Sequence, residues 1–347
     1  MTLKDIGHRL GLSPTQVSRA LGGYPDVSDE TRRRVEDAVE ALGYRPNPNA
    51  RRLRLGRSGI VGLVVPENSE QEESNILLEI LLGLAVEFWK RDVLVVLNVM
   101  PKTTPSTQSY TRLFQQGAVD GFVVVNPSAD PAALDFLMDE AIPFVTHGRA
   151  TAAARYPFVD LDNHAVGRMT AARLADLGHR DIAFIDGPED SFSAAERLAG
   201  LDAVLSERGL ARQEALTCRG MMTEHFGEAA TLALFDRLPD GQGRAPTAIM
   251  VGNLVLATGV MRALQRLGLS VPGDVSVMAH DDMLARYPRA GLVPDLSGTA
   301  SAFTDAWGDI AGFLARAIDG KTPEGLQKLI APRAIAGASV GAPASKA

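Results

Sequence analysis

The sequence predicts an α/β protein with a small helical domain at its N-terminus, and three observations support this prediction. Three short, capped helical patterns occupy the first 45 residues. From residue 59 to residue 280, seven apolar stretches typical of buried parallel strands alternate with seven helical stretches. The alternation breaks near residues 148–162, which favours two doubly wound lobes over one continuous sheet.

Each N-terminal helical pattern begins at a residue suited to cap a helix. Thr2 precedes the first pattern in a capping-box arrangement. Ser13 precedes the second, and Pro14 occupies the first helical position, where its missing N–H is no loss. Ser28 precedes the third. Two short helices joined by a glycine-containing turn predict a helix-turn-helix headpiece over residues 1–46.

The remaining pattern defines the strands and helices of the larger part. The predicted strands span residues 59–65, 92–98, 121–126, 143–147, 181–187, 247–253 and 274–280. The helical patterns span residues 75–90, 107–117, 131–140, 163–177, 193–208, 225–238 and 253–267. The small-residue tail from Gly337 to Ala347 is expected to be frayed.

Charge is segregated along the chain, although the net charge is only −7. Residues 1–60 contain 11 Lys and Arg against 7 Asp and Glu, a balance of +4, which leaves 24 against 35, or −11, for the remainder. Between Ala41 and Pro66 there are five arginines and no acid. Such a basic segment is typical of proteins that bind phosphate groups, and a solvated basic linker is the alternative.

Several functional classes receive no support from the sequence. Cys218 is the lone cysteine, and the six histidines lack metal-ligand spacing, so we predict no metal site. The chain contains no P-loop, GxSxG or HExxH motif, so we predict neither an enzyme nor a cofactor. The N-terminus has no apolar signal segment, and no apolar run is long enough to span a bilayer, so we expect a cytoplasmic location.

The second helix carries side chains suited to reading DNA. Thr15 offers a hydroxyl and a methyl group, Gln16 can read adenine or hold a phosphate, and Arg19 can form a bidentate pair with guanine. Pro14 and Ser18 lie on the same short helix. In a helix-turn-helix protein these residues enter the major groove, whereas the alternative is a solvated polar face.

The arginine-rich segment predicts a conditional helix. Asn47 is suited to cap it, and residues 47–57 have almost no hydrophobic face. So short a helix is marginal alone in water and should form only against a partner. Leu53 lies among the arginines, and an apolar residue flanked by cations is suited to wedge into a minor groove.

These residues resemble a known family. The segments TLKDIGHRLGLSPTQVSRALGG, RPNPNARRLRLGRSG, VDLDN (159–163) and LADLGHRDIAFIDG (174–187) are similar to those of the lactose-repressor family of bacterial transcription regulators. The resemblance covers essentially the whole chain. It implies a periplasmic-binding-protein-like core with an effector cleft between its lobes, and a homodimer acting on a near-palindromic double-stranded DNA operator. It also implies an N-terminal core lobe of residues 58–160 and about 290–320, and a C-terminal lobe of residues 161–289 and about 321–340.

The resemblance also implies the site residues. For DNA these are Pro14, Thr15, Arg19, Asn47, Ala50 and Leu53, and the neighbouring polar and basic residues Gln16, Ser18, Arg51 and Arg54 are further candidates. For the effector they are Asn126, His147, Arg149, Ser191, Ser193, Arg197, Asn253 and Asp281. Phe158, Phe192 and Met222 are candidates for an apolar wall, with a core role as the alternative. The chain departs from the family pattern at Leu254, Ala279 and His280.

We therefore expect a transcriptional repressor whose operator affinity is controlled by a small molecule. Carboxylate, amide and guanidinium groups at the implied effector positions suit a polyhydroxy ligand, so a sugar is expected. A regulator that responds to a nucleobase or an amino acid is the alternative. A solute-binding protein without a DNA role is a further alternative, against which the arginine-rich segment speaks.

Overall fold

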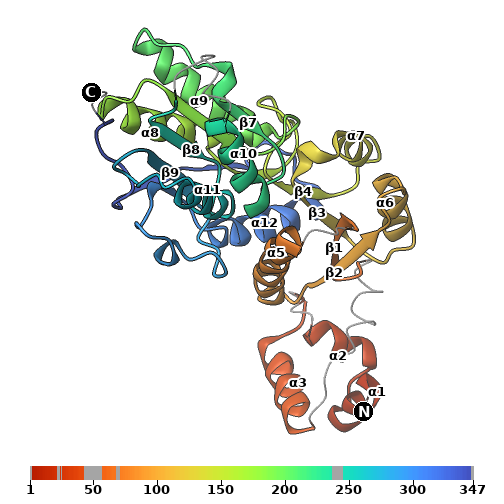
Figure 1. The fold of residues 1–347 in the computed structure, drawn as a ribbon. Coiled ribbons are helices and arrows are strands. Elements are labelled where there is room, and N and C mark those ends of the chain that lie inside the picture. Colours follow the sequence, from red (N-terminus) through yellow and green to blue (C-terminus); the bar gives the residue numbers. More distant parts are fainter. Residues whose placement is uncertain are drawn as a thin grey trace. The chain divides into compact units, whose positions relative to one another are not determined.

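The computed structural model of the protein describes residues 2–21, 24, 26–42, 57–67, 71–236 and 245–344. The chain divides into two units, Met1–Ser58 and Gly59–Ala347, which we call the headpiece and the core and describe separately (Figure 1). No helix in the described ranges is both long and apolar enough to cross a membrane.

Three helices form the described headpiece: α1 (Leu3–Leu10), α2 (Pro14–Leu21) and α3 (Asp29–Ala41). The predicted capping box of α1 is confirmed, because the Thr2 hydroxyl accepts from the Asp5 N–H at 3.4 Å and the Asp5 carboxylate accepts from the Thr2 N–H at 2.7 Å. Buried apolar side chains hold the three helices together, namely Ile6, Val17, Ala20, Val35 and Ala38. One side of α2 is thereby buried, and its other side faces solvent.

The first lobe of the core is built on a parallel sheet with the strand order β11-β5-β4-β3-β1-β2 among the described residues. Its strands are β1 (Ile60–Pro66), β2 (Leu94–Met100), β3 (Gly121–Val125), β4 (Phe144–His147), β5 (Phe158–Leu161) and β11 (Gln327–Ile330). The helices α5 (Gln71–Trp89) and α12 (Thr304–Ile318) share one apolar core with this sheet. The helices α6 (Ser106–Gln115) and α7 (Pro131–Asp139) share a second apolar core with it.

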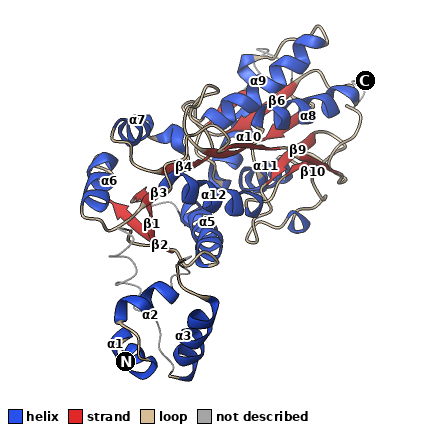
Figure 2. Ribbon diagram, turned by 180° about the vertical axis from the view of Figure 1, so that it is seen from behind, coloured by secondary structure: helices blue, strands red, loops and turns tan. Residues whose placement is uncertain are grey.

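The second lobe repeats this layered arrangement (Figure 2). Its strand order is β12-β10-β9-β8-β6-β7, with β6 (Ile182–Asp186), β7 (Thr217–Arg219), β8 (Ala248–Val251), β9 (Ser276–Asp281), β10 (Ser297–Ala300) and β12 (Arg333–Ile335). The pairs are parallel except that β12 runs antiparallel to β10. The helices α8 (Asn163–Asp176) and α9 (Phe192–Glu207) share one core, and α10 (Glu224–Asp236) and α11 (Leu254–Arg266) share the other. Short 3-10 turns lie at Pro127–Ala129 (η1), Glu214–Leu216 (η2) and Arg289–Gly291 (η3).

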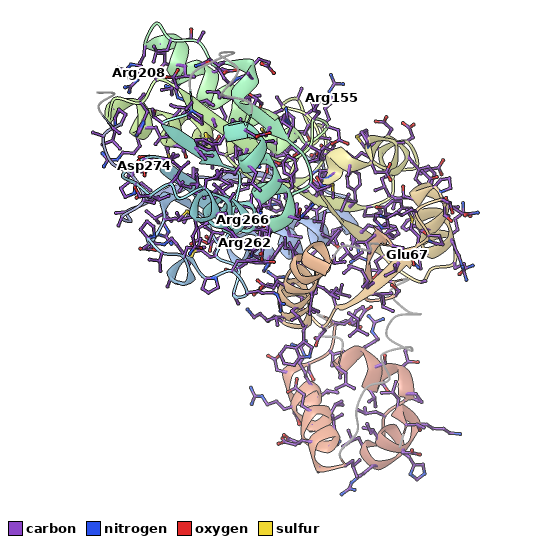
Figure 3. The ribbon with its side chains drawn as sticks, viewed as in Figure 1. Glu67, Arg155, Arg208, Arg262, Arg266 and Asp274 are labelled. Carbon is purple, nitrogen blue, oxygen red and sulfur yellow. The ribbon has the colours of Figure 1, made fainter. Side chains whose placement is uncertain are left out.

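Ion pairs on the surface join α10 to α11. Arg262 contacts Glu224 at 2.7 Å and Glu228 at 3.4 Å, and Arg266 contacts Glu228. Arg262 and Arg266 lie next to each other on α11 in Figure 3. These exposed pairs each contribute less than about 1 kcal/mol, so apolar packing is the main force that holds the two helices together.

The predicted strands and helices of the core agree with the structure. All seven predicted strands and all seven predicted helices are present, with ends displaced by no more than four residues. The sequence analysis missed the helix α12 and the strands β5, β7, β10, β11 and β12. These strands have only three or four residues each, which is too short for the periodicity that identifies a strand.

The expected division of the C-terminal segments between the lobes is wrong at two strands. β10 lies in the segment 290–320, expected in the N-terminal lobe, but it pairs with β9 of the second sheet. β11 lies in the segment 321–340, expected in the C-terminal lobe, but it pairs with β5 of the first sheet. The reason is that the chain crosses back to the first lobe only after β10 and returns to the second lobe only between β11 and β12.

The C-terminal tail is hydrogen-bonded to the second sheet as far as Gly341, so the expectation that it is frayed from Gly337 onward is wrong for residues 337–341. Ser339 is completely buried. Its hydroxyl donates to the Val277 carbonyl at 2.6 Å and accepts from the Ser297 N–H at 2.8 Å. Small residues in this tail allow close approach to the sheet, and their composition had suggested a loose end.

Candidate nucleic-acid interface and interlobe site

The outward side of α2 carries the side chains predicted to contact DNA, namely Pro14, Thr15, Gln16, Ser18 and Arg19. The first three are exposed and the other two are half-buried. The inward residues Val17 and Ala20 are buried in the headpiece core. The N-terminal half of α2 is therefore open to a duplex, as the second helix of a helix-turn-helix must be.

Gln16 is held by Ser13 at the start of α2. Its Oε1 accepts from the Ser13 N–H at 2.9 Å and from the Ser13 hydroxyl at 3.0 Å, while that hydroxyl accepts from the Gln16 N–H at 3.2 Å. A bidentate contact with adenine needs both Oε1 and Nε2 of a glutamine. Because Oε1 is committed to the cap, only Nε2 is left to donate, which suits a phosphate oxygen better than adenine.

Arg19 is paired within the headpiece. Its Nη2 donates to Asp26 Oδ2 at 2.6 Å, and its guanidinium carbon lies 4.7 Å from the centroid of the Tyr24 ring. The hydrogen bond from Arg19 lowers the pKa of the Asp26 carboxyl. Any contact of Arg19 with a base must therefore compete with this acid.

The other predicted DNA contacts lie outside the described residues. These are Asn47, Ala50, Arg51, Leu53 and Arg54, together with all of the predicted helix 47–57 except Arg57. Their roles remain predictions.

The predicted effector residues of the core lie near the carboxyl ends of strands in both lobes, except Phe158, which begins β5. Asn126 follows β3, His147 ends β4 and Arg149 follows it, Ser191 and Ser193 follow β6, Arg197 lies on α9, Asn253 follows β8, and Asp281 ends β9. In doubly wound sheets, ligands bind beyond the carboxyl ends of the strands. We call these residues, together with Asp160, Asn163, Asp186, Phe192, His280 and Asp282, the interlobe site.

A buried ion pair lies at the centre of the second lobe's half of this site. Arg197 Nε and Nη2 donate to the two carboxylate oxygens of Asp186 at 2.7 and 2.8 Å, and Nη1 donates to Asn163 Oδ1 at 2.6 Å. The side chains of Arg197 and Asp186 are 6% and 0% exposed. A Cβ at Gly252 would lie 2.1 Å from Asp186 Oδ1, so only glycine fits there. The position of Arg197 is thus fixed by its partners.

A second arginine connects the two lobes. Arg149 Nε donates to Asp160 Oδ2 at 2.8 Å within the first lobe. Its guanidinium carbon lies 5.3 Å from the ring centroids of both Phe158, in the first lobe, and Phe192, at the start of α9. The Ser128 hydroxyl of the first lobe accepts from the Phe192 N–H at 3.4 Å. These contacts bring the carboxyl edges of the two sheets together.

Burial raises the pKa of carboxyl groups in this site. The pKa of Asp160 is raised by burial, although the hydrogen bond from Arg149 opposes the shift. Burial raises the pKa of Asp282 to about 7, and the nearby carboxylates Asp281 and Asp186 add to this shift while Arg197 opposes it. Asp281 Oδ1 accepts from the Met283 N–H at 2.7 Å.

Two histidines of the site are neutral near pH 7. Burial lowers the pKa of His280 to about 3, and its two ring nitrogens lie 2.9 Å from Thr299 Oγ1 and 3.1 Å from Ser301 Oγ. Burial lowers the pKa of His147 to about 4, and its ring contacts those of Phe303 and Trp307 with centroids 5.3 and 5.0 Å away.

Two of the predicted effector residues also cap helices. The Ser191 hydroxyl accepts from the Ala194 N–H at 3.4 Å at the start of α9, and Asn253 Oδ1 accepts from the Leu256 N–H at 3.0 Å at the start of α11. The Asn253 cap uses only the oxygen, which leaves the Nδ2 hydrogens for other partners. Ser193 lies 3.0 Å from Ser191 through their hydroxyl oxygens. Asn126 is exposed, with a left-handed backbone of φ 51°.

Two of the three residues that depart from the family pattern pack in an apolar core. Leu254 and Ala279 belong to the buried core of the second lobe. Among the candidates for an apolar wall, Met222 packs against that same core. Phe158 is buried in the core between β3, β4, α6 and α7. His280 differs, because it bonds to two hydroxyls on and just after β10.

The sequence analysis missed four polar members of the site: Asp160, Asn163, Asp186 and Asp282. A signal for them existed, because each lies at or just after the end of a strand, as in the VDLDN segment at 159–163. Their partners could not be read from the sequence, because hydrogen bonds across the site depend on tertiary packing. In the described part of the chain, no cluster of three or more His, Cys, Asp or Glu residues could hold a metal ion.

We expect the free energy of unfolding to fall as the pH drops below about 6.5, the ordinary pKa of histidine. The folded-state pKa values of His147 and His280 are lowered to about 4 and about 3, so the unfolded chain binds protons that the folded chain does not. Their contribution is complete above the unfolded pKa and is lost as the pH falls toward the folded values. The pKa of Asp282 is raised to about 7 in the folded chain, so this single group offsets part of the loss from the two histidines over the same pH range. Urea unfolding between about pH 7 and about pH 5 measures this slope.

Two histidine variants isolate this pH effect. His280→Gln should show a shallower pH dependence than the wild type, because one buried imidazole is gone. The exposed His225 offers the matched control, and His225→Gln should keep the wild-type slope. An unchanged slope in His280→Gln would contradict a neutral buried imidazole at this position.

A three-helix headpiece whose second helix exposes its polar side, joined to a two-lobed core with polar side chains at the ends of its strands, is the architecture of a DNA-binding regulator. Family comparisons agree with this class. Residues 2–47 match the family model described as "Bacterial regulatory proteins, lacI family", and residues 171–340 match the one described as "Periplasmic binding protein-like domain".

Full-length relatives extend the match. The HTH-type transcriptional regulator AglR of Rhizobium meliloti (strain 1021) is 37% identical over 98% of this chain and 94% of its own length. The HTH-type transcriptional regulator RafR of Escherichia coli is 32% identical over 99% of both chains. The chain belongs to the lacI family of bacterial regulatory proteins and is a DNA-binding transcriptional regulator.

Solved structures have the same architecture. The complex of the transcriptional regulator CelR with cellobiose is 28% identical, with a TM-score of 0.70 over 98% of this chain and 99% of that chain. The lac repressor dimer bound to operator and the anti-inducer ONPF has a TM-score of 0.74 at 23% identity, over 99% of both chains, and shows the shared fold.

Proposed function

We propose that this regulator is a cytoplasmic repressor whose operator affinity is set by a sugar bound in the interlobe site. The observation that carries the proposal is the buried polar network of Arg197, Asp186 and Asn163, which lies beside the cross-lobe contacts of Arg149. Such a network offers both donors and acceptors, as recognition of hydroxyl groups requires. The cellobiose bound to the similar regulator CelR supports a sugar as the ligand.

DNA recognition is assigned to α2 and to the segment 47–57. Pro14, Thr15, Gln16, Ser18 and Arg19 would meet the major groove. The residues Asn47, Ala50, Arg51, Leu53 and Arg54 would order only on the operator, with Leu53 as an apolar wedge in the minor groove. Binding would thus couple folding of this segment to recognition of the sequence.

The protein would act as a homodimer on a near-palindromic operator. Large apolar side chains are exposed along one side of α5 and on the adjacent edge strand β2, namely Leu78, Leu82, Val86, Trp89, Leu94, Val96 and Val99. The opposite side of α5, with Ile80, Leu84 and Phe88, is already buried in the first lobe. An exposed apolar surface of this kind is typical of an interface, and the dimeric lac repressor supports a second copy of this chain as the partner.

The effector would act by binding one arrangement of the lobes more tightly than another. Differential affinity of this kind shifts the equilibrium between arrangements and hence the affinity for DNA. An inducer would release the operator, whereas a corepressor would tighten binding.

The test of this function uses an operator selected from random duplexes. The full-length protein should bind the selected duplex about a thousandfold or more tighter than random competitor. Addition of disaccharides, beginning with cellobiose, should change that affinity for at least one sugar. Equal affinity for all duplexes, with and without sugars, nucleobases and amino acids, would contradict the proposal. A change of affinity only with a nucleobase or an amino acid would show that the effector is that compound and not a sugar.

Asp26→Asn should raise the affinity for random duplexes by up to about tenfold, because it removes an acid that competes with DNA phosphates for Arg19. The same substitution should reduce the ratio of the affinity for the operator to the affinity for random duplexes. Fluorescence anisotropy against both duplexes over a salt series measures both changes.

Two further headpiece variants sharpen this measurement. Asp29→Asn is the matched control, since Asp29 is 84% exposed on the same headpiece and does not contact Arg19. Arg19→Ala should weaken operator binding by about tenfold to a hundredfold. Equal effects of Asp26→Asn and Asp29→Asn would show that only net charge matters.

A further inference from the structure

We propose that the effector is an uncharged sugar held through its hydroxyl groups, and that the interlobe site discriminates against phosphorylated and acidic sugars. The inference rests on the proposed function and adds the charge class of the ligand.

Carboxylates outnumber guanidinium groups in the interlobe site. The site contains four carboxyl groups, namely Asp160, Asp186, Asp281 and Asp282, and two guanidinium groups, namely Arg149 and Arg197. The pKa of Arg197 is raised against its burial by Asp186, and Asp160 and Asp282 lie close enough to add to this shift, so these groups form one electrostatic cluster. The two histidines of the site add no positive charge near pH 7. Burial raises the pKa of Asp282 to about 7, so this group is partly protonated at neutral pH, but the other three carboxylates still outnumber the two guanidinium groups. An anion entering this cluster meets an excess of negative charge at low dielectric, where repulsion is strong.

The cations near the site are already compensated. Arg197 is held bidentately by Asp186 and has a third bond to Asn163. Arg219, at the end of β7, donates to the carbonyls of Gly187 and Pro188 at 3.3 and 2.9 Å. A phosphate would have to displace these partners, which would leave buried groups such as Asp186 unpaired.

Arg149 can donate hydrogen bonds to a ligand, although its positive charge is compensated by Asp160. Its Nε is bound to Asp160 at 2.8 Å, and the side chain is only 9% exposed. The rings of Phe158 and Phe192 lie against its guanidinium, so its Nη1 and Nη2 groups are the part left to donate to a ligand. The Asp160 carboxylate compensates the charge of Arg149, so these N–H groups suit neutral hydroxyl oxygens.

The acceptors of the site require a ligand that can donate. Asp281 Oδ1 accepts from the Met283 N–H, which leaves Oδ2 for a ligand. Asp282 lies 3.5 Å from the Nε2 of His280, a neutral partner. Hydroxyl groups donate to such carboxylates, whereas a phosphate dianion cannot and is repelled by them.

The aromatic pair of the site argues against a stacked nucleobase. Phe158 and Phe192 come from different lobes and would make a suitable stacking slot for a planar ring. The guanidinium of Arg149 already occupies the position next to both rings, 5.3 Å from each centroid. A ligand that binds through hydroxyl groups at its edge leaves this arrangement intact.

Matched pairs of ligands test the inference on the full-length protein. Thermal shift and calorimetry would compare cellobiose, trehalose, sucrose and glucose with cellobionic acid, trehalose 6-phosphate, sucrose 6-phosphate, glucose 6-phosphate and glucuronate. At least one uncharged sugar should raise the melting temperature and bind about tenfold or more tightly than its anionic counterpart. An anionic member that binds more tightly than its uncharged counterpart overturns the inference and leaves a sugar-responsive regulator in place. Binding by no member of the set overturns the sugar effector itself, and the charge class with it.

Variants of the chain tie the discrimination to the site. Asp282→Asn removes one carboxylate without leaving a buried cation unpaired. The substitution should reduce severalfold the ratio of the affinity for an uncharged sugar to the affinity for its phosphorylated counterpart. The matched control is Asp135→Asn, the same charge change at an exposed position of α7, which should leave the ratio unchanged. An equal ratio in the Asp282→Asn variant and the wild type would show that this carboxylate does not set the charge class.

Discussion

Replacing Trp89 by aspartate is expected to convert the proposed dimer to a monomer and to weaken operator binding by about a hundredfold to ten-thousandfold. Trp89 is 74% exposed at the end of α5, beside the other apolar side chains of α5 and β2. Burying a carboxylate in such an interface costs several kcal/mol. A monomer holds one half-site at a time and so loses the effective concentration that links the two headpieces.

Analytical ultracentrifugation and operator titration would measure the effect of Trp89→Asp. The matched control is Met138→Asp, because Met138 is 39% exposed on α7, which packs in a different apolar core of the first lobe from the one that contains α5. The control should stay dimeric and keep its operator affinity. A dimeric Trp89→Asp variant, or loss of dimer in both variants, would show that the interface lies elsewhere.

Arg197→Ala is expected to destabilise the core by about 3–5 kcal/mol and to abolish the response to sugar. The substitution leaves the fully buried Asp186 without its cation and removes the donor to Asn163. The loss of stability comes mostly from the orphaned carboxylate. The double variant Arg197→Met with Asp186→Leu should therefore recover much of the stability while still failing to respond to sugar.

Urea unfolding of the variants would measure these differences. Arg208→Ala is the matched control, because Arg208 forms a 2.7 Å pair with Asp176 at the exposed end of α9, with side chains 34% and 61% exposed (Figure 3). This control should lose less than about 1 kcal/mol. Equal losses in Arg197→Ala and Arg208→Ala, or a double variant no more stable than Arg197→Ala, would contradict the buried ion-pair argument.

Local features of the fold could be predicted from the sequence because the physics that determines them is local. Thr2 and Ser28 cap their helices as expected, since a capping side chain bonds to a backbone group only three residues away. Seven strands were found because each is an apolar run long enough to stand out. A strand such as Ser297–Ala300 has no such signal and is defined by its neighbours β9 and β12.

The location of the candidate residues near strand ends was predictable from the sequence, but their pairing was not. Arg149 and Arg197 were predicted to hold a ligand, and each is bound in the structure to a carboxylate that the sequence analysis did not single out. In both pairs the partners are eleven residues apart, on opposite sides of a turn whose shape the sequence does not reveal. Gln16 differs from these arginines, because Ser13 and Gln16 form a capping box between residues three apart, which is a signal that the sequence itself carries.

The position of β11, β12 and Ser339 near the end of the chain has a consequence for synthesis on the ribosome. The first sheet receives its edge strand from residues 327–330, and the second receives its own from residues 333–335 together with the strap around Ser339. Neither lobe can complete its sheet before nearly the whole polypeptide has been translated, whereas the headpiece can fold as soon as it emerges. A stop codon placed before Gln327 would therefore leave a folded DNA-binding module attached to two incomplete lobes.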